Sequence, residues 1–331
     1  MKKAIANICR FLLAVTFLFS GFVKANDPMG MAYKIADYFT AFGIPSPEWL
    51  NIVLAVLLAC FEVGLSACLY LNRKAISILM VVVMTVLTAF TVYIYIENPV
   101  SDCGCFGDAI ILTNGETLAK NCVLLAAAIV MLIFHKHLFK YVSRKWGWLL
   151  PLTELVLAMI YSAYCLIYQP VIDFRPYKVG YNMNERVELE EAEVEGVKVA
   201  RYDAAGFTLL DENGDDVTYE PFETEGTVYL ITVPNLNEAN CGCVGEIDEL
   251  YDYAMMKGEQ FYFITASDEE AIQEWKDKTA AEYPFYVGDE RVLKTVVRAN
   301  PGLVVIKDGV IISKSGTVTL GNDINKLIHK N

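Results

Sequence analysis

Histidine is scarce in this chain: His135, His137 and His329 are the only three among 331 residues. Zinc sites in proteins are built largely from histidine and cysteine, and neither a histidine nor a methionine cluster accompanies the cysteine pairs described below. We therefore predict no metal site and no cofactor that the sequence requires. Binding of Cu(I) by paired thiolates needs no histidine, so a Cu(I) carrier stays open as an alternative.

Residues 171–331 are poor in basic side chains. They hold 31 Asp and Glu against 15 Lys and Arg, a net charge of −16, whereas the preceding part of the chain carries +3. Nucleic acids bind to cationic surfaces, so no nucleic acid is expected as a partner. The whole chain is 55% hydrophobic with a mean hydropathy of +0.36, which is too apolar for an ordinary soluble protein. This indicates an apolar N-terminal part followed by a water-exposed, acidic C-terminal part.

Five long apolar runs lie in the first half of the chain. A helix needs roughly 20 mostly apolar residues to cross the hydrocarbon core of a bilayer. The runs that approach or reach this length are residues 4–23, 50–71, 75–96, 118–134 and 148–168. A signal peptide is the alternative for the first run, but Lys24 stands at the poor cleavage site and further runs follow. We predict five transmembrane helices, with the lipid bilayer as a partner.

The loop at residues 97–116 contains no Lys or Arg. Positive charges collect on the cytoplasmic side of a membrane, and here they precede run one and lie between runs two and three and between runs four and five. They are Lys2, Lys3, Arg73, Lys74, Lys136, Lys140, Arg144 and Lys145. Lys120, near the outer end of run four, is an exception. The pattern predicts a bacterial inner-membrane protein with a cytoplasmic N-terminus and a periplasmic or otherwise extracytoplasmic C-terminal domain.

Two Cys-Gly-Cys triplets, at residues 103–105 and 241–243, carry the reactive chemistry. The first lies in the loop without basic residues, and the second lies between a strand-like run (227–233) and a helix-like run (246–256). Thiol–disulfide exchange needs an attacking thiolate and a second thiol that resolves the mixed disulfide, and a helix N-terminus lowers the pKa of a thiol. Both triplets fall on the predicted oxidising side of the membrane. We predict two redox pairs, with a structural bridge as the alternative for each.

The second triplet lies in a region that resembles the thioredoxin family. From residue 227 onward the expected order is strand, helix, strand, helix, strand, strand, helix. Residues 240–246, Asn-Cys-Gly-Cys-Val-Gly-Glu, are similar to the family's Trp-Cys-Gly-Pro-Cys-x-x-Glu with one residue deleted, and residues 300–302, Asn-Pro-Gly, are similar to its cis-proline loop. The resemblance covers about residues 205–331 and implies an α/β thioredoxin-like domain.

The same resemblance implies roles for three residues. Cys241 would attack, Cys243 would resolve, and Pro301 would pack against the pair. The sequence departs from the family because the pair is Cys-x-Cys and because Asn240 stands where the family has Trp. The redox potential and the substrate range are therefore not carried over.

The membrane part resembles the DoxX-like proteins and their MauE branch, the methylamine-utilisation proteins. Residues 19–24, Phe-Ser-Gly-Phe-Val-Lys, and Asp-Pro at 27–28 are similar to the first-helix signature, and the loop at 103–107 is similar to the MauE branch. The resemblance covers about residues 1–140 and implies a four-helix membrane bundle. Its architecture is similar to the vitamin K epoxide reductase-like and DsbB-like systems, which pass electrons from an outside thiol protein through a membrane loop pair to a quinone. A quinone is implied here by that analogy alone.

Two ionisable residues and one cysteine within the membrane runs, and Lys24 directly after run one, are further candidates. Charged groups at this depth are functional candidates by default, and Glu62 in run two would be neutralised by a contact with Arg10 or with Lys24. A structural ion pair and a proton-handling role are both open. Cys122, near the outer end of run four, is a candidate third redox thiol.

These observations predict a four-helix membrane domain (1–140), a tethering fifth helix (147–170), a linker (171–204) and a thioredoxin-like domain (205–331). The predicted function is a membrane-bound thiol–disulfide oxidoreductase. Its outer pair, Cys241/Cys243, would exchange with extracytoplasmic client proteins that carry thiols or disulfides, and with the loop pair Cys103/Cys105. The alternatives are a non-catalytic assembly or maturation factor with structural cysteines, and the Cu(I) carrier.

Overall fold

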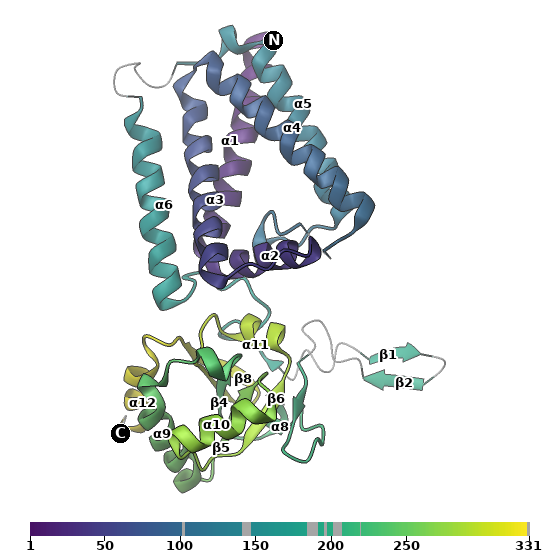
Figure 1. Cartoon of the computed structure of the whole chain (residues 1–331). Helices are drawn as coiled ribbons and strands as arrows, with labels where there is room; N and C mark the ends of the chain where they lie inside the picture. The colour runs from purple at the N-terminus through teal and green to yellow at the C-terminus, as the bar shows by residue number, and fades with distance from the viewer. Residues whose placement is uncertain are drawn as a thin grey trace. The chain divides into compact units, whose positions relative to one another are not determined.

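The computed structural model describes most of the chain. The described residues are 1–100, 103–140, 147–183, 191–194, 197–200, 207–218 and 220–329. Arg144 and Lys145, used above for the orientation, and most of the predicted linker lie outside the described residues. The chain divides into two compact units (Figure 1), which we call the membrane unit (Met1–Leu166 with Pro170–Ile172) and the α/β unit (Ile167–Gln169 with Asp173–Asn331).

The membrane unit contains five helices that are long and apolar enough to cross a bilayer, counted over the described residues. They are α1 (Lys2–Asn26), α3 (Glu48–Cys68), α4 (Lys74–Glu97), α5 (Asn114–Ile133) and α6 (Leu149–Tyr168). Short 3₁₀ turns follow three of them: η1 (Leu69–Leu71), η2 (Gly107–Ala109) and η3 (His135–His137). Each helix coincides with one predicted apolar run to within four residues at either end, so the prediction of five apolar helices of membrane-spanning length is confirmed.

A small residue brings the first two membrane helices together. The helix α1 packs against α3 and α5, and α4 packs against α5. A Cβ atom built on Gly21 would lie 2.7 Å from Val63 Cγ2 and 3.0 Å from the Ala59 carbonyl oxygen, so only glycine permits this approach of α1 to α3. Lys24 lies one turn after Gly21 on α1, and Glu62 directly precedes Val63 on α3. The close approach of the two helices therefore brings Lys24 within reach of Glu62.

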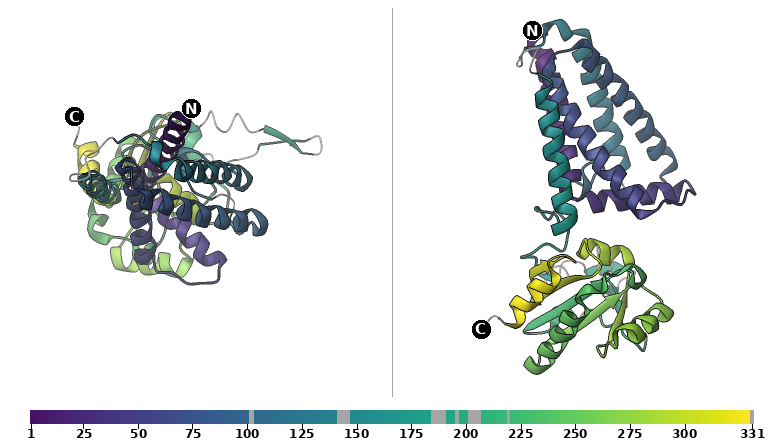
Figure 2. Two further views of the ribbon diagram at one scale, coloured as in Figure 1. Left: turned by 90° about the horizontal axis from the view of Figure 1, so that it is seen from above. Right: turned by 60° about the vertical axis from the view of Figure 1, so that its left-hand side comes forward.

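Residues 24–49, which the apolar runs leave as a connecting loop between the first two predicted spans, contain a helix, α2 (Pro28–Ala41). The Asp27 side chain accepts a hydrogen bond from Gly30 N at 2.9 Å, and Pro28 occupies the first turn. Both are helix-start signals. In Figures 1 and 2 α2 lies at a steep angle to α1 and α3. Its 14 residues are too few to cross the hydrocarbon core.

The α/β unit is built on a six-stranded mixed sheet with the order β3-β6-β5-β4-β7-β8. Its strands are β3 (Leu209–Leu210), β4 (Thr227–Val233), β5 (Gln260–Thr265), β6 (Phe285–Gly288), β7 (Gly302–Lys307) and β8 (Val310–Ser315). Its helices are α8 (Glu220–Glu223), α9 (Val244–Lys257), α10 (Glu269–Thr279), α11 (Glu290–Val296) and α12 (Leu320–Ile328), with the 3₁₀ turns η4 (Leu236–Glu238) and η5 (Cys241–Cys243). A separate hairpin joins β1 (Glu191–Val194) to β2 (Val197–Ala200).

The strand directions follow from the connections. Strand β4 is parallel to β5, β5 is parallel to β6, and β7 is antiparallel to both β4 and β8. The helices α9 and α10 provide the two crossovers that parallel neighbours need. The predicted thioredoxin-like order of strands and helices is confirmed. It omitted β6 and α11, which are only four and seven residues long and too short to show a clear hydrophobic period.

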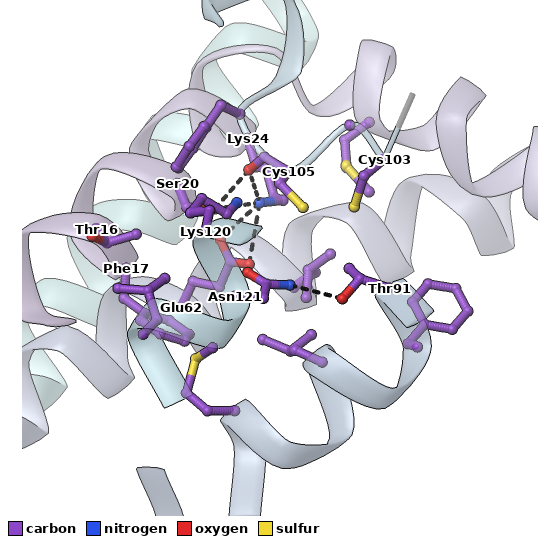
Figure 3. Close-up of a pocket in the computed structure, with 18 of the residues that line it drawn as sticks. Thr16, Phe17, Ser20, Lys24, Glu62, Thr91, Cys103, Cys105, Lys120 and Asn121 are labelled. Carbon is purple, nitrogen blue, oxygen red and sulfur yellow. Dashed lines mark hydrogen bonds and ion pairs between the residues drawn. The ribbon is translucent and has the colours of Figure 1, made fainter. Parts of the chain in front are cut away.

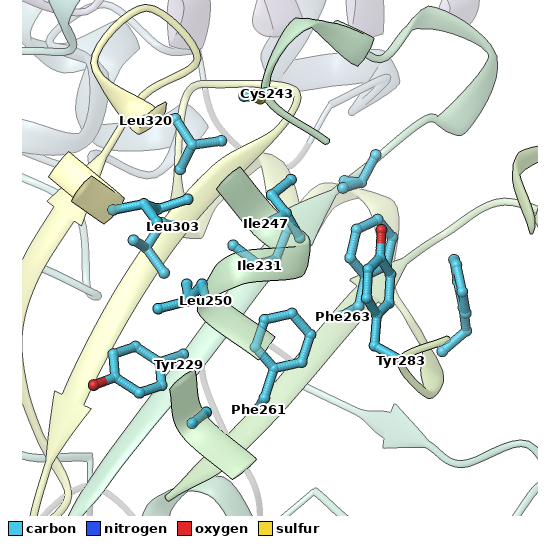
Figure 4. Close-up of a cluster of buried hydrophobic side chains, with 14 of the residues drawn as sticks. Tyr229, Ile231, Cys243, Ile247, Leu250, Phe261, Phe263, Tyr283, Leu303 and Leu320 are labelled. Carbon is cyan, nitrogen blue, oxygen red and sulfur yellow. The ribbon is translucent and has the colours of Figure 1, made fainter. Parts of the chain in front are cut away.

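Apolar clusters cover both faces of this sheet. Ile247, Leu250 and Ala254, whose spacing places them on one face of α9, are each fully buried against β4 and β5. Figure 4 shows Ile247 and Leu250 among the side chains of this cluster, with Phe263 and Tyr283 stacked beside them at a ring-centroid distance of 4.8 Å. This packing fixes the N-terminal end of α9, which directly follows the Cys-Gly-Cys triplet.

Part of the predicted linker belongs to the α/β unit. Tyr177 and Met183 are buried in its second apolar cluster. Asp173 forms ion pairs with Arg175 at 2.7 Å and with Lys314 of β8 at 2.8 Å. The described start of the segment is thus packed on the sheet.

Gly302 offers a test of the packing next to Pro301. A Cβ atom on Gly302 would lie 2.6 Å from Val297 Cγ1, in the buried cluster behind β7. We expect Gly302→Ala to lower the free energy of unfolding by about 1–3 kcal/mol through overpacking. The matched control is Gly245→Ala on α9, where nothing lies within 4 Å and alanine should stabilise the helix by up to about 1 kcal/mol. Thermal unfolding of the two variants checks this, and equal midpoints would contradict it.

Candidate functional site

The first cysteine pair lies in the connection between α4 and α5. Both thiols are half-buried, and Gly104 between them adopts a positive φ of 67°. A Cβ atom at Gly104 would lie 2.8 Å from Lys34 Cγ on α2. Glycine therefore serves both the turn and the close approach to α2. Tyr38, also on α2, donates a hydrogen bond to the Cys103 carbonyl oxygen at 3.2 Å.

A buried cation on α1 holds this loop against the helices. Lys24 Nζ donates to the Cys105 carbonyl oxygen at 2.7 Å and to Ser20 Oγ at 2.6 Å, and it forms an ion pair with Glu62 Oε2 at 2.9 Å. Ser20 Oγ lies 2.7 Å from the same Cys105 carbonyl oxygen. Figure 3 shows these groups converging below the loop. We call Ser20, Lys24 and Glu62 the clamp.

The contacts within the clamp offset the desolvation penalty of burying the Lys24 and Glu62 charges. Lys24 is 4% exposed and Glu62 is 8% exposed, and isolated charges at such positions carry a large desolvation cost. Of the two predicted partners for Glu62, the structure places Lys24 in contact with it. Arg10 lies 14 residues earlier on α1, about 21 Å along the helix axis, and donates to the Phe139 carbonyl oxygen at 2.9 Å.

The two thiols of the loop pair are chemically unequal. A hydrogen bond from Cys103 to the Cys105 sulfur, together with the positive charges of Lys120 and Lys24, lowers the pKa of Cys105 to about 6 although burial opposes this. The same hydrogen bond and burial raise the pKa of Cys103. The hydrogen bond and the two cations thus favour the thiolate form of Cys105 over that of Cys103, and thiol–disulfide exchange needs one such thiolate beside a second thiol.

A cavity of about 230 Å³ lies below the loop pair. Its wall is mainly apolar and is contributed by α1, α2, α3, α4, α5 and the loop itself. Cys103, Cys105, Lys120 and the clamp residues all line it (Figure 3). The sulfur atoms thus adjoin a space inside the membrane unit.

Cys122, the predicted third redox thiol, does not line this cavity. It is exposed on α5, whereas Lys120, Asn121 and Leu124 on the same helix line the cavity. Successive helical residues are about 100° apart, so a position next to a cavity-lining residue can face outward. The position of Cys122 gives it no part in the site around Cys105.

The second pair lies at the start of α9. Cys241 is half-buried, whereas Cys243 is 7% exposed and caps the helix. The Asn240 side chain accepts a hydrogen bond from Gly242 N at 2.9 Å and so closes the turn. Burial, assisted by the nearby Glu246 carboxylate, raises the pKa of Cys243 to about 11. The more accessible thiol is thus Cys241, and the buried one keeps its proton.

The predicted proline loop adjoins the second pair. The peptide bond between Asn300 and Pro301 is cis, as the thioredoxin resemblance implies. Asn240 N donates to the Asn300 carbonyl oxygen at 3.3 Å, and Asn300 Nδ2 donates to the Asn235 carbonyl oxygen at 2.7 Å. The residue that replaces the family's Trp therefore links the cysteine turn to the proline loop.

Ser20, Tyr38 and Lys120 are site residues to which the sequence analysis assigned no functional role. Ser20 lies four residues before Lys24, a spacing that places both on one helix face. Lys120 is the basic residue that departs from the predicted charge pattern, and this departure could have pointed to a role in the site. Tyr38 lies on a helix that was expected to be a loop. Within the described residues, no group of three or more His, Cys, Asp or Glu is placed to hold a metal ion.

Comparisons with known proteins bear on each unit separately. Residues 2–134 match the family described as methylamine utilisation protein MauE. A search among curated proteins finds no significant match. A thiol:disulfide interchange protein from Bacteroides sp. is 17% identical, with a TM-score of 0.30, and the match covers 37% of this chain and 85% of that one.

A second similar structure is the thioredoxin domain of a thiol-disulfide oxidoreductase from Bacteroides vulgatus. It is 19% identical, with a TM-score of 0.29, and the match covers 40% of this chain and 99% of that one. The chain thus joins a membrane region that matches the MauE family over residues 2–134 to a C-terminal α/β region with the thioredoxin-like order of strands.

Proposed function

We propose that this protein is a membrane-bound thiol–disulfide oxidoreductase whose two Cys-Gly-Cys pairs exchange electrons with each other. Cys241 would also exchange with client proteins outside the cytoplasm. The membrane region with MauE similarity and the thioredoxin-like α/β region are the two parts that such a protein needs. The observation that carries the proposal is the geometry of the loop pair, in which two half-buried cysteines line one cavity and Lys24 donates to the Cys105 carbonyl oxygen at 2.7 Å.

The exchange is balanced between the two pairs. A thiolate of the reduced pair attacks a sulfur of the oxidised pair, so one disulfide bond breaks and a mixed disulfide forms. The remaining thiol of the attacking pair then loses its proton and displaces the other sulfur. Two electrons move between the pairs, one disulfide is replaced by another, and the potentials of the two pairs set the direction.

The membrane topology predicted from the charge pattern would place both cysteine pairs on the same side of the membrane, as this exchange requires. With the N-terminus in the cytoplasm of a bacterium and five spans, both pairs lie outside the inner membrane, where disulfides persist. The helix α6 joins the membrane unit to the α/β unit in one chain. Because the second pair is tethered, its effective concentration at the first pair is high.

Trapping the mixed disulfide in intact cells tests the proposal. The variant Cys103→Ser retains Cys105 as the attacking thiol and the Cys241–Cys243 disulfide as its target, and it lacks the thiol that would resolve the mixed disulfide. After quenching with a membrane-impermeant alkylating reagent, we expect mass spectrometry to find a peptide that links Cys105 to Cys241. The matched control is Cys105→Ser, in which Cys103 is the remaining loop thiol and the linked peptide should be at least about tenfold less abundant, because Cys103 lacks the Lys24 cation that helps to acidify Cys105.

Three other outcomes would overturn the proposal. Adducts of Cys241 to other proteins alone would indicate an exchanger with a passive membrane unit. Two pairs that stay bridged and resist reductant would indicate an assembly factor with structural cysteines. Copper that co-purifies with the reduced chain and is lost in Cys241→Ala would indicate a Cu(I) carrier.

A further inference from the structure

The charged side chains that line the cavity below the loop pair do not cancel. They are two cations and one carboxylate, Lys24, Lys120 and Glu62, which gives the wall a net charge of +1. Lys24 and Glu62 form the ion pair of the clamp at 2.9 Å. Lys120 Nζ instead lies 4.2 Å from the centroid of the Phe106 ring, and no ion pair joins it to a carboxylate of the described residues. The excess positive charge therefore belongs to Lys120.

The carboxylate that could have paired with Lys120 on its own helix is engaged elsewhere. Glu116 lies one turn earlier on α5, at a spacing where Glu and Lys side chains meet. Its carboxylate instead accepts hydrogen bonds from Thr113 N at 2.9 Å and from Thr113 Oγ1 at 2.8 Å, and so completes the capping box of α5. A cation over an aromatic ring keeps its full charge. Lys120 is therefore able to attract an anion into the cavity.

Both cysteines of the loop pair share the cavity wall with this cation. Figure 3 shows the side chains of Cys103, Cys105 and Lys120 in the wall, and each of the three residues is partly exposed. The loop itself is predicted to face the aqueous space outside the cytoplasm. When the pair is bridged, neither sulfur carries a charge. The charge of Lys120 is then uncompensated in the form of the site that an incoming thiolate attacks.

The volume of the cavity restricts the size of a ligand. It is about 230 Å³, and an apolar protein cavity of about 150 Å³ admits benzene, so roughly six to ten non-hydrogen atoms fit. Leu58 on α3, Leu87 on α4 and Ile35 on α2 contribute aliphatic side chains to the wall. A short carbon chain with one charged end matches a wall that is mainly aliphatic and has a single unpaired cation.

From these observations we infer that the loop pair exchanges with a small anionic thiol, a molecule with one thiol and one carboxylate or sulfonate group, and that Lys120 selects its negative charge. This inference rests on the proposed redox role of the loop pair and names a substrate class for it. The thiolate of one molecule attacks the Cys103–Cys105 disulfide, which breaks as a mixed disulfide forms. A second molecule displaces the first as a small disulfide, and the pair gains two electrons and the two protons that the small thiols release.

The test compares thiols of different charge on the full-length protein in nanodiscs of neutral lipid, with Cys241→Ala and Cys243→Ala so that the second pair takes no part. The bridged protein is mixed with mercaptoacetate, 2-mercaptoethanol or 2-aminoethanethiol at equal thiolate concentration, and release of the Cys103 and Cys105 thiols is followed by alkylation and peptide mass spectrometry. We expect mercaptoacetate to react at least about fivefold faster than 2-mercaptoethanol, and 2-aminoethanethiol to react slowest. The preference should shrink as the ionic strength rises.

Substitutions of two lysines make the result specific. Lys120→Met should reduce the ratio of the mercaptoacetate and 2-mercaptoethanol rates to less than about two, whereas Lys120→Arg, which keeps the charge, should retain the preference. The matched control is Lys34→Met, because Lys34 lies beside Gly104 of the loop but is not part of the cavity wall. It should leave the ratio unchanged. The neutral thiol reports in each variant whether the loop is intact, and Lys120→Gln replaces Lys120→Met if that variant does not fold.

Equal rates for the anionic and the neutral thiol would overturn the inference, and so would a preference that persists when the Lys120 charge is removed. Failure of this experiment leaves the Cys105–Cys241 adduct unaffected, because that adduct forms within the chain and without a small thiol. Conversely, a missing adduct alongside a Lys120-dependent preference would remove the relay between the pairs and leave the exchange with small anionic thiols in place.

Discussion

Cys105 is expected to react with an alkylating reagent along a pH profile whose midpoint lies near pH 6, well below the pKa of about 8.5 of an ordinary cysteine. The thiolate is the reactive form, so reactivity is present above this midpoint and is lost as the pH falls through it. Cys243, whose pKa is raised to about 11, should stay unreactive across the same range. Alkylation rates of the reduced full-length protein, followed by mass spectrometry from pH 4 to 9, provide the measurement.

The largest cause of the Cys105 shift is the hydrogen bond from Cys103. We expect Cys103→Ala to raise the Cys105 midpoint by at least about one pH unit, whereas Cys103→Ser, which keeps a donor, should raise it less. The matched control is Cys122→Ala, which removes an exposed thiol of α5 and should leave the midpoint unchanged. An unshifted midpoint in Cys103→Ala would show that Cys103 does not acidify its neighbour.

Removing one charge of the buried Lys24–Glu62 pair is expected to destabilise the protein nearly as much as, or more than, removing both charges. Lys24→Met leaves Glu62 buried without its cation, and Glu62→Gln leaves Lys24 without its carboxylate. Each single variant should lose about 3–5 kcal/mol, and the double variant should lose clearly less than the sum, because no uncompensated charge remains. Thermal unfolding of the four proteins in one detergent completes the cycle. Additive losses would contradict a direct Lys24–Glu62 interaction.

The clamp also predicts an effect on the thiol. In Lys24→Met the Cys105 midpoint should rise, because the Lys24 cation is gone while the Glu62 carboxylate, which raises the pKa of Cys105, remains. A purely structural ion pair would leave the midpoint where it is. The control cycle is Arg10→Met with Glu62→Gln, whose losses should add within about 0.5 kcal/mol because the two side chains are not in contact. Coupling in this second cycle would restore Arg10 as the partner of Glu62.

The sequence alone was sufficient to predict those elements whose formation depends on a local residue pattern. Five apolar runs of membrane length became five helices, because hydropathy over a span of some 20 residues is set by those residues alone. The strand and helix order after residue 227 was predictable for the same reason, apart from β6 and α11, which are shorter than a readable period. The helix α2 was missed although Asp27 and Pro28 carry its start signal, since an outer loop was expected there.

The sequence by itself determined the two Cys-Gly-Cys pairs, the membrane runs and the thioredoxin-like order, because each is written in neighbouring residues. Only the tertiary structure decided that Glu62 pairs with Lys24, 38 residues away, and that Lys24 also reaches the Cys105 carbonyl, 81 residues away. It also decided which thiol of the loop pair is acidified and that a cavity lies beneath it. These properties depend on distances and burial that arise when α1, α3 and α5 pack together, and no single segment of the chain contains them.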